Sequence, residues 1–155
     1  MLVDWIDKMF IHAFEKQWYT TYWAFDIHGV ILKPNYRKNS QYVNFYPYAK
    51  ETLQLLTKRE DIIMIMYTSS YPKEIEYYYR IFKNNKIYFK YINENPDIDS
   101  IKGNFGYYKN KFYFNVLFED KSGFSAEIEW KQIYDYLIDC EKRSFLPNPK
   151  WSTKY

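Results

Sequence analysis

Three short apolar runs, each closed by polar side chains, constrain the fold of this chain more than any other feature. The runs cover residues 22–25, 62–67 and 114–118, and the polar closures are Asp26, Thr68 with Ser69, and Glu119 with Asp120. Apolar runs of this length, of which the third includes Asn115, are typical of strands buried on both faces, as in a parallel sheet. Ligands of such sheets bind beyond the carboxyl ends of the strands. The pattern therefore predicts a polar site at one edge of a parallel sheet.

Helical patterns separate these runs. Apolar residues recur every three or four positions over 3–17, 49–58 and 126–141, and Pro72 opens a further helix. Residues 86–91 are an additional strand candidate. Strands that alternate with helices predict an α/β fold, here a Rossmann-like three-layer sandwich with a parallel sheet. We expect at least four strands in the spatial order 4-1-2-3, counted along the chain.

The chain of 155 residues has the length of a single domain, which we expect to span 1–155. A helix within residues 1–18 precedes the first strand. It can pack on its own domain or on a second subunit, so a homo-oligomer formed through this helix is left open. Residues 144–155 contain prolines and predict an irregular tail.

Composition excludes several classes of protein. The net charge of +3 is too small to indicate a nucleic-acid-binding protein, although aromatic residues make up 23% of the chain. A single cysteine, Cys140, excludes an internal disulfide and fits a reducing compartment. No apolar run approaches the roughly 18 residues that a transmembrane helix needs. We therefore expect a cytoplasmic protein without a membrane partner.

The polar closures also occur in a recognisable order. Residues 23–30 read Trp-Ala-Phe-Asp-Ile-His-Gly-Val, the second run ends at Thr68, and lysines precede a last run that ends in paired acids. This ordered set, over about residues 20–140, resembles the haloacid dehalogenase (HAD) superfamily, most of whose members are phosphohydrolases. The gaps between the motifs are too short for the large cap domain of some members. The resemblance implies a small, capless, phosphatase-like protein.

What the resemblance implies for the acidic residues follows the chemistry of phosphoryl transfer. A carboxylate nucleophile and a phosphoryl group repel each other, so a divalent cation lies between them, and oxygen ligands suit Mg²⁺. Asp26 corresponds to the nucleophile that forms an aspartyl phosphate. Asp26, Glu119, Asp120 and the backbone carbonyl of His28 correspond to the Mg²⁺ ligands. The implied activity is a Mg²⁺-dependent phosphomonoesterase.

The remaining motifs supply contacts to the phosphoryl group. Thr68 corresponds to the family's hydroxyl that bonds a phosphoryl oxygen, with Ser69 beside it. The family's lysine offsets the charge of the aspartyl phosphate, and both Lys109 and Lys111 lie at a suitable position before the last run. Lys111 is the preferred candidate, and Lys109 is retained as a substrate-binding residue.

His28 departs from the family pattern. Related phosphatases carry an aspartate there, which acts as general acid to the leaving group and general base to the attacking water. Histidine titrates near neutral pH and can serve in both roles. The replacement also supports an alternative, a HAD-like binding or interaction module with little or no turnover.

The segment 31–50 carries basic residues interleaved with aromatic residues and no acidic residue. Lys33 and Arg37 are its substrate-binding candidates, since cations and aromatic rings together suit a nucleotide or a nucleic-acid end. The other reading is a solvated hairpin in a tyrosine-rich protein. The substrate is thus expected to be phosphorylated, either a small molecule or a nucleic-acid end.

Overall fold

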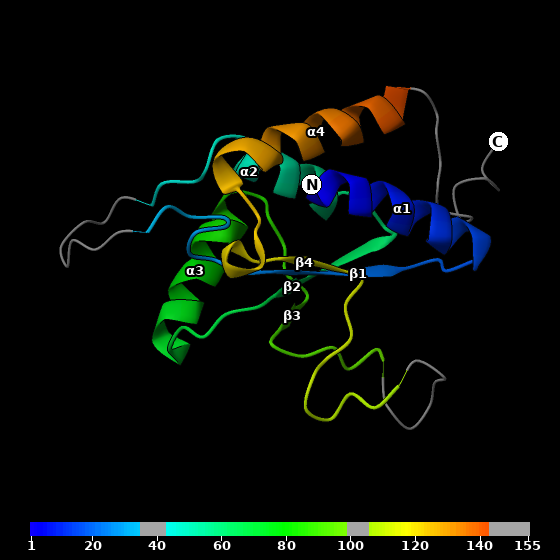
Figure 1. Ribbon diagram of the computed structural model, residues 1–155. Helices are drawn as coiled ribbons and strands as arrows, with labels where there is room; N and C mark the ends of the chain where they lie inside the picture. Colours follow the sequence, from blue (N-terminus) through cyan, green and yellow to red (C-terminus); the bar gives the residue numbers. More distant parts are fainter. Residues whose placement is uncertain (35–42, 99–105, 143–155) are drawn as a thin grey trace.

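The computed structural model describes residues 1–34, 43–98 and 106–142. Within these ranges a parallel sheet contains four strands in the order β3-β2-β1-β4 (Figure 1). The strands are β1 (Thr21–Phe25), β2 (Ile62–Met66), β3 (Tyr91–Ile92) and β4 (Val116–Phe118). The fold class and the spatial order 4-1-2-3 predicted from the sequence are therefore confirmed.

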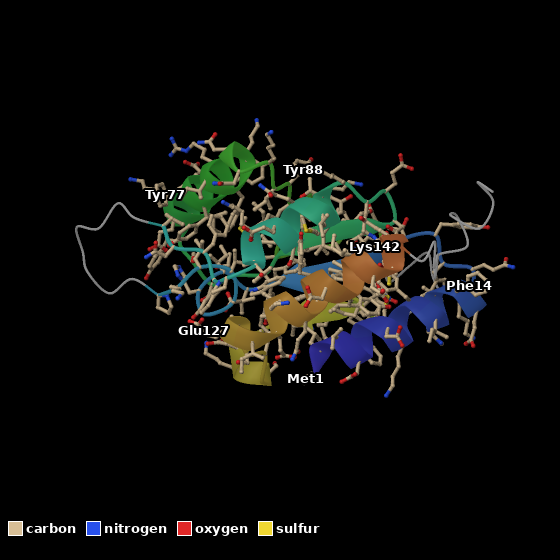
Figure 2. All side chains as sticks on the ribbon, turned by 90° about the horizontal axis from the view of Figure 1, so that it is seen from above. Met1, Phe14, Tyr77, Tyr88, Glu127 and Lys142 are labelled. Atoms are coloured by element: carbon tan, nitrogen blue, oxygen red, sulfur yellow. The ribbon has the colours of Figure 1, made fainter. Side chains whose placement is uncertain are left out.

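The helices are α1 (Leu2–Glu15), α2 (Ala49–Thr57), α3 (Pro72–Asn84) and α4 (Ala126–Lys142), and a short 3-10 turn, η1 (Asp120–Ser122), follows β4. Helices α1, α2 and α4 cover one face of the sheet, and α3 lies beyond the carboxyl ends of the strands (Figure 1). Seen from above, α4 lies between α2 and α1 (Figure 2). The start of α3 is fixed by Pro72 and by Glu74, whose carboxylate accepts the Tyr71 N–H at 2.8 Å.

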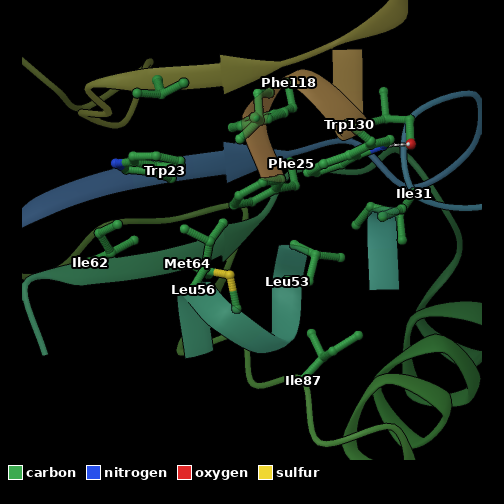
Figure 3. Close-up of a cluster of buried hydrophobic side chains, with 14 of the residues drawn as sticks. Trp23, Phe25, Ile31, Leu53, Leu56, Ile62, Met64, Ile87, Phe118 and Trp130 are labelled. Atoms are coloured by element: carbon green, nitrogen blue, oxygen red, sulfur yellow. Dashed lines mark hydrogen bonds between the residues drawn. The ribbon is translucent and has the colours of Figure 1, made fainter. Parts of the chain in front are cut away.

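An aromatic stack forms the core between the helices and the sheet (Figure 3). The rings of Phe25 and Phe118 stack at 4.3 Å between centroids, and Trp130 of α4 stacks on Phe118 at 5.1 Å. The indole N–H of Trp130 donates to the Val30 carbonyl at 2.7 Å, so the buried polar atom is paired. This stack anchors β1 and β4, the two strands that carry the acidic residues.

The opposite face of the sheet is covered by the connection between β3 and β4. Tyr22 contacts Tyr113 of this connection edge-to-face at 6.1 Å, and its hydroxyl donates to Asp97 at 3.4 Å. The three layers are therefore helices, sheet and connection, and the described residues of the third layer, 93–98 and 106–115, contain no helix. In the described part of the chain there is no separate cap domain.

The prediction of a strand over residues 86–91 was wrong in its position. The structure has a strand only at Tyr91–Ile92, because the amides of Lys86 and Ile87 donate to Lys83 and Phe82 at the end of α3. Lys86 also has a positive φ of 59°. The apolar side chains in this segment are buried against the core and not in the sheet.

Helix α1 packs on its own domain. The Leu2 amide donates to Glu129 at 2.7 Å, the Trp5 indole N–H donates to the Asn115 carbonyl at 3.0 Å, and the Tyr136 hydroxyl donates to Asp7 at 2.9 Å. A homo-oligomer through this helix stays a prediction. Among the described residues, no helix has the length and apolar character to cross a bilayer. The expected irregular tail, 144–155, lies outside the described residues.

Candidate functional site

Three carboxylates meet beyond the ends of β1 and β4. Phe25 and Phe118 are paired in register on these strands, so the residues that follow them, Asp26 and Glu119, leave the sheet side by side. Together with Asp120, they place carboxylate oxygens within 4.8 Å of one another. The sequence predicted these residues as a group, and the parallel register brings them together.

Asp26 is held in place by the backbone on both sides of it. Its amide donates to the Phe118 carbonyl at 2.9 Å, and its Oδ1 accepts the Ile27 N–H at 2.8 Å. Burial raises the pKa of Asp26 above its ordinary value; the Asp120 carboxylate adds to the rise, and the Ile27 N–H opposes it. The half-buried carboxyl is thus fixed in direction and costly to ionise without a cation nearby.

Glu119 is subject to the same constraint as Asp26. Burial raises the pKa of Glu119, and a hydrogen bond with the Asp120 carboxyl and the charge of Asp26 raise it further. The amide of Lys121 points at both groups, 3.2 Å from Glu119 Oε1 and 2.8 Å from Asp120 Oδ1. One amide does not compensate several carboxylates, so the cluster favours a bound cation.

Gly29 allows the loop after β1 to approach Asp120. Its φ is +79°, and a Cβ at this position would lie 2.6 Å from Asp120 Oδ2. The loop is a tight turn, in which the amides of Ile31 and Leu32 both donate to the Ile27 carbonyl at 2.9 Å. The backbone of this turn therefore borders the acidic cluster directly.

Thr68 is positioned by a residue that the sequence analysis missed, Asn93. The Thr68 amide donates to Asn93 Oδ1 at 2.8 Å, and Asn93 Nδ2 donates to the Thr68 carbonyl at 2.7 Å. The Thr68 hydroxyl contacts Ser70 Oγ at 2.9 Å. Asn93 has a positive φ of 53°, a conformation that asparagine tolerates. The sequence signal that could have identified Asn93 is the position of an asparagine just after a strand.

A cleft of about 810 Å³ connects these groups. Five residues predicted from the sequence line it, namely Asp26, Thr68, Ser69, Lys111 and Glu119. Asn93 and Lys121 also line it, and Lys121 lowers the pKa of Asp26 through its charge. Lys121 directly follows the acid pair, which is a signal that the sequence analysis did not use.

Two other predicted cations, Lys109 and Lys33, do not line the cleft. Lys109 Nζ lies 5.8 Å from the ring centroid of Tyr107, and Lys111 Nζ lies 5.8 Å from the ring centroid of Phe114. Of the two, only Lys111, the preferred candidate, lines the cleft. Lys33 forms an ion pair of 3.2 Å with Glu127 at the start of α4. Arg37 lies outside the described residues, and the substrate-binding role of the 31–50 segment stays a prediction.

The ring of His28 is turned toward α3. Its Nε2 lies 2.9 Å from the hydroxyl of Tyr78, and the two rings meet edge-to-face at 5.1 Å. The ring is exposed, and its nitrogens are outside the group of clustered ligand atoms. Tyr78 is separated from His28 by 50 residues, and no local pattern could have predicted this contact.

The donor set suits a hard cation. The clustered ligand atoms are all carboxylate oxygens, with no sulfur or nitrogen, which matches the preference of Mg²⁺. The cleft is also lined by Thr68, which carries a hydroxyl, and by Lys111 and Lys121, which carry ammonium groups. These groups together can accommodate a cation and an anionic group next to Asp26.

The fold and this edge define an α/β protein with an acidic cleft at the carboxyl ends of a parallel sheet. No family model and no curated protein matches the chain. Among solved structures, the chain is similar to a conserved protein from Bacteroides thetaiotaomicron, with a TM-score of 0.57 and 19% sequence identity. The similarity covers 77% of this chain and 91% of that chain. At this identity the likeness shows the fold alone.

Proposed function

We propose that this chain is a HAD-like, Mg²⁺-dependent phosphohydrolase that cleaves a phosphomonoester through an aspartyl phosphate on Asp26. One observation carries the proposal: the carboxylates of Asp26, Glu119 and Asp120 cluster at a cleft that also contains Thr68 and Lys111. A nucleophile, a cation-binding acid pair and phosphate-binding groups are the parts that this reaction requires. A cytoplasmic location belongs to the same proposal, and the single cysteine, Cys140, is a buried free thiol.

Asp26 performs the covalent step. Its carboxylate oxygen forms a bond to phosphorus while the ester bond to the leaving oxygen breaks and that oxygen takes a proton. Water then forms a new bond to phosphorus, the bond to Asp26 breaks, and phosphate leaves. The hydrogen bond from the Ile27 amide to Oδ1 fixes the direction of the attacking carboxylate.

The surrounding residues bind and orient the phosphoryl group. Mg²⁺, held by Asp26, Glu119 and Asp120, would supply charge compensation between the carboxylate and the phosphoryl oxygens. Asn93 holds the backbone of Thr68 through a pair of hydrogen bonds, so that the Thr68 hydroxyl has a fixed place in the cleft. Lys111 and Lys121 add positive charge along the same wall.

His28 would act as the proton donor and acceptor, with Tyr78 bonded to its Nε2. The same contact favours a second function, a HAD-like binding module with little or no turnover. A ring held by Tyr78 and replacing the usual carboxylate leaves the cation and phosphate groups intact. Such a module would bind the phosphorylated ligand without cleaving it.

The two functions are separated by hydrolysis of a panel of phosphomonoesters with and without Mg²⁺. We expect the wild-type protein to release phosphate only with Mg²⁺, and Asp26→Asn to release none. An acid quench of the wild-type reaction should trap phosphorylated Asp26. Binding of Mg²⁺ and phosphate without release from any ester would support the binding module. Equal release by wild type and Asp26→Asn would rule out the proposed mechanism.

A further inference from the structure

The cleft has an aromatic wall in addition to its polar groups. Tyr67, Phe112 and Phe114 line it, on the side formed by the end of β2 and the connection to β4. Tyr67 and Phe112 meet at 5.9 Å and 63°, and Phe112 and Phe114 at 5.8 Å and 68°. In an edge-to-face pair one ring contributes only its edge, so the wall keeps aromatic surface that the pairs do not cover.

These rings are not part of the main core. The buried cluster between helices and sheet includes neither Tyr67 nor Phe112 nor Phe114. Met66 faces that core, and Tyr67, the next residue, projects the opposite way and is 39% exposed. Phe112 and Phe114 are half-buried. The rings are held by the fold but remain accessible from the cleft.

Polar groups occur beside the rings as well. Asn110 lines the same wall, and its amide can both donate and accept a hydrogen bond. Asn93, by contrast, uses both amide atoms to hold Thr68. Lys111 and Lys121 line the same cleft and supply positive charge, and Lys111 Nζ lies 5.8 Å from the ring centroid of Phe114. A ligand that joins a flat group with hydrogen-bonding edges to a phosphate would match the rings, the amide and the positive charges of this cleft.

The size of the cleft fits such a ligand. Its volume of about 810 Å³ is within the range of roughly 300–1,000 Å³ that is usual for small-molecule sites. Ring faces attract nucleobases through stacking that tolerates any base. Sugar phosphates without a base would leave the aromatic wall uncovered.

We infer that the aromatic wall of Tyr67, Phe112 and Phe114 is a nucleobase subsite, and that the phosphomonoester is carried by a nucleotide. This inference rests on the proposed function for the position of the phosphate. A free mononucleotide and the phosphorylated end of an oligonucleotide share this chemistry.

The test is equilibrium binding by calorimetry in an Asp26→Asn background with Mg²⁺, where no ligand is cleaved through Asp26. Adenosine 5′-monophosphate is compared with ribose 5-phosphate and inorganic phosphate. We expect the nucleotide to bind roughly 5- to 150-fold more tightly than ribose 5-phosphate, as stacking of one base supplies. A 5′-phosphorylated oligonucleotide distinguishes a nucleic-acid end from a free nucleotide.

Tyr67→Ala is the diagnostic variant, because the exposed ring can be removed while the backbone bond from Tyr67 N–H to the Phe25 carbonyl stays. It should weaken nucleotide binding by about fivefold or more and leave ribose 5-phosphate unchanged. Phe112→Leu is the second variant. The matched control is Tyr88→Ala, an exposed tyrosine between α3 and β3 that is labelled in Figure 2 and does not line the cleft.

Equal affinity for adenosine 5′-monophosphate and ribose 5-phosphate would overturn the inference, as would an equal loss in Tyr88→Ala. Nucleotide preference without hydrolysis would support the subsite and refute the phosphohydrolase. Hydrolysis of sugar phosphates and nucleotides with the same KM would support the phosphohydrolase and refute the subsite.

Discussion

On β1 and β4, the last core residue and the first site residue are neighbours in the chain. Phe25 and Phe118 stack at 4.3 Å inside the molecule, while Asp26 and Glu119, one position further, converge in a half-open cleft. The first pair gains free energy by contact, whereas the second pair is a repulsive arrangement whose pKa values are raised. The stability of the aromatic core offsets the repulsion among the carboxylates. The strands hold the carboxylates together because the aromatic stack beneath them is stable.

We expect the largest effect on hydrolysis from a change at Asp26, the residue that follows the core residue Phe25. Asp26→Asn should reduce phosphomonoester hydrolysis by roughly 10⁴-fold or more, since it removes the nucleophile of the covalent step. Steady-state phosphate release measures this loss. The thermal unfolding midpoint of Asp26→Asn should equal or exceed that of wild type, because a half-buried carboxylate has become neutral. A large fall in the midpoint would instead give Asp26 a structural role.

The adjacent core residue should show the opposite behaviour. Phe118→Ala should lower the free energy of unfolding by about 3–5 kcal/mol, because a fully buried ring and its contacts with Phe25 and Trp130 are lost. Denaturant unfolding measures the change. Phe14→Ala on α1, where the ring is 47% exposed, is the control and should change stability by less than about 0.5 kcal/mol. Similar losses in the two variants would contradict the assigned core.

Two glycines near the site sharpen the comparison further. Gly29→Ala should cost about 1–2 kcal/mol of stability because of its positive φ, and the new Cβ would displace Asp120. We expect Mg²⁺ affinity, measured by calorimetry, to fall about tenfold or more. Gly123→Ala is the matched control, since Gly123 has a φ of +99° with no atom near its Cβ position. If Gly29→Ala and wild type bound Mg²⁺ with equal affinity, the turn that contains Gly29 would not be part of the cation site.

The smallest effect concerns repulsion within the acidic cluster. Without Mg²⁺, Glu119→Gln should be more stable than wild type at neutral pH by at most about 1 kcal/mol, because solvent screens this partly exposed carboxyl. The amide oxygen can still accept the Lys121 N–H. For a chain of this size the unfolding midpoint would rise by at most roughly 2–4 °C.

The pH dependence gives the sign of this effect. Because the pKa of Glu119 is raised in the folded protein, the folded state binds more protons, and wild-type stability falls as pH rises through the folded pKa. The advantage of Glu119→Gln should therefore shrink as pH is lowered toward about 4. Saturating Mg²⁺ should reverse the order, because it stabilises the wild-type folded state that binds it. If the stability difference between Glu119→Gln and wild type did not change with pH or Mg²⁺, repulsion among the carboxylates would be excluded as its cause.

Local sequence predicted most of the sheet and five of the twelve residues that line the cleft. The apolar runs that end at Asp26, Thr68 and Glu119 identify the strands and their polar ends, because buried parallel strands leave few other patterns. The segment around Ile87 was misassigned as a strand for a physical reason. Its amides cap α3, and an apolar run alone does not say whether the backbone pairs with a helix end or with a neighbouring strand.

Contacts between distant segments were decided only by the tertiary structure. Asn93 bonds Thr68 across 25 residues, Tyr78 bonds His28 across 50, and the rings of Tyr67 and Phe112 meet across the sheet edge. Each of these partners lies in a segment whose own pattern is ordinary. Side-chain periodicity reports which face a residue occupies, but it carries no information on which distant segment reaches that face.

The sequence by itself thus determined the parallel sheet and the acidic residues at its strand ends, because strands buried on both faces require apolar runs and the polar residues that follow them mark where they end. The tertiary structure decided which groups face one another: Lys111 in the cleft and Lys33 on Glu127, the ring of His28 on Tyr78, and an aromatic wall beside the carboxylates. Those choices depend on how the connection packs under the sheet, and the energy of that packing is shared among many weak contacts that no short motif records.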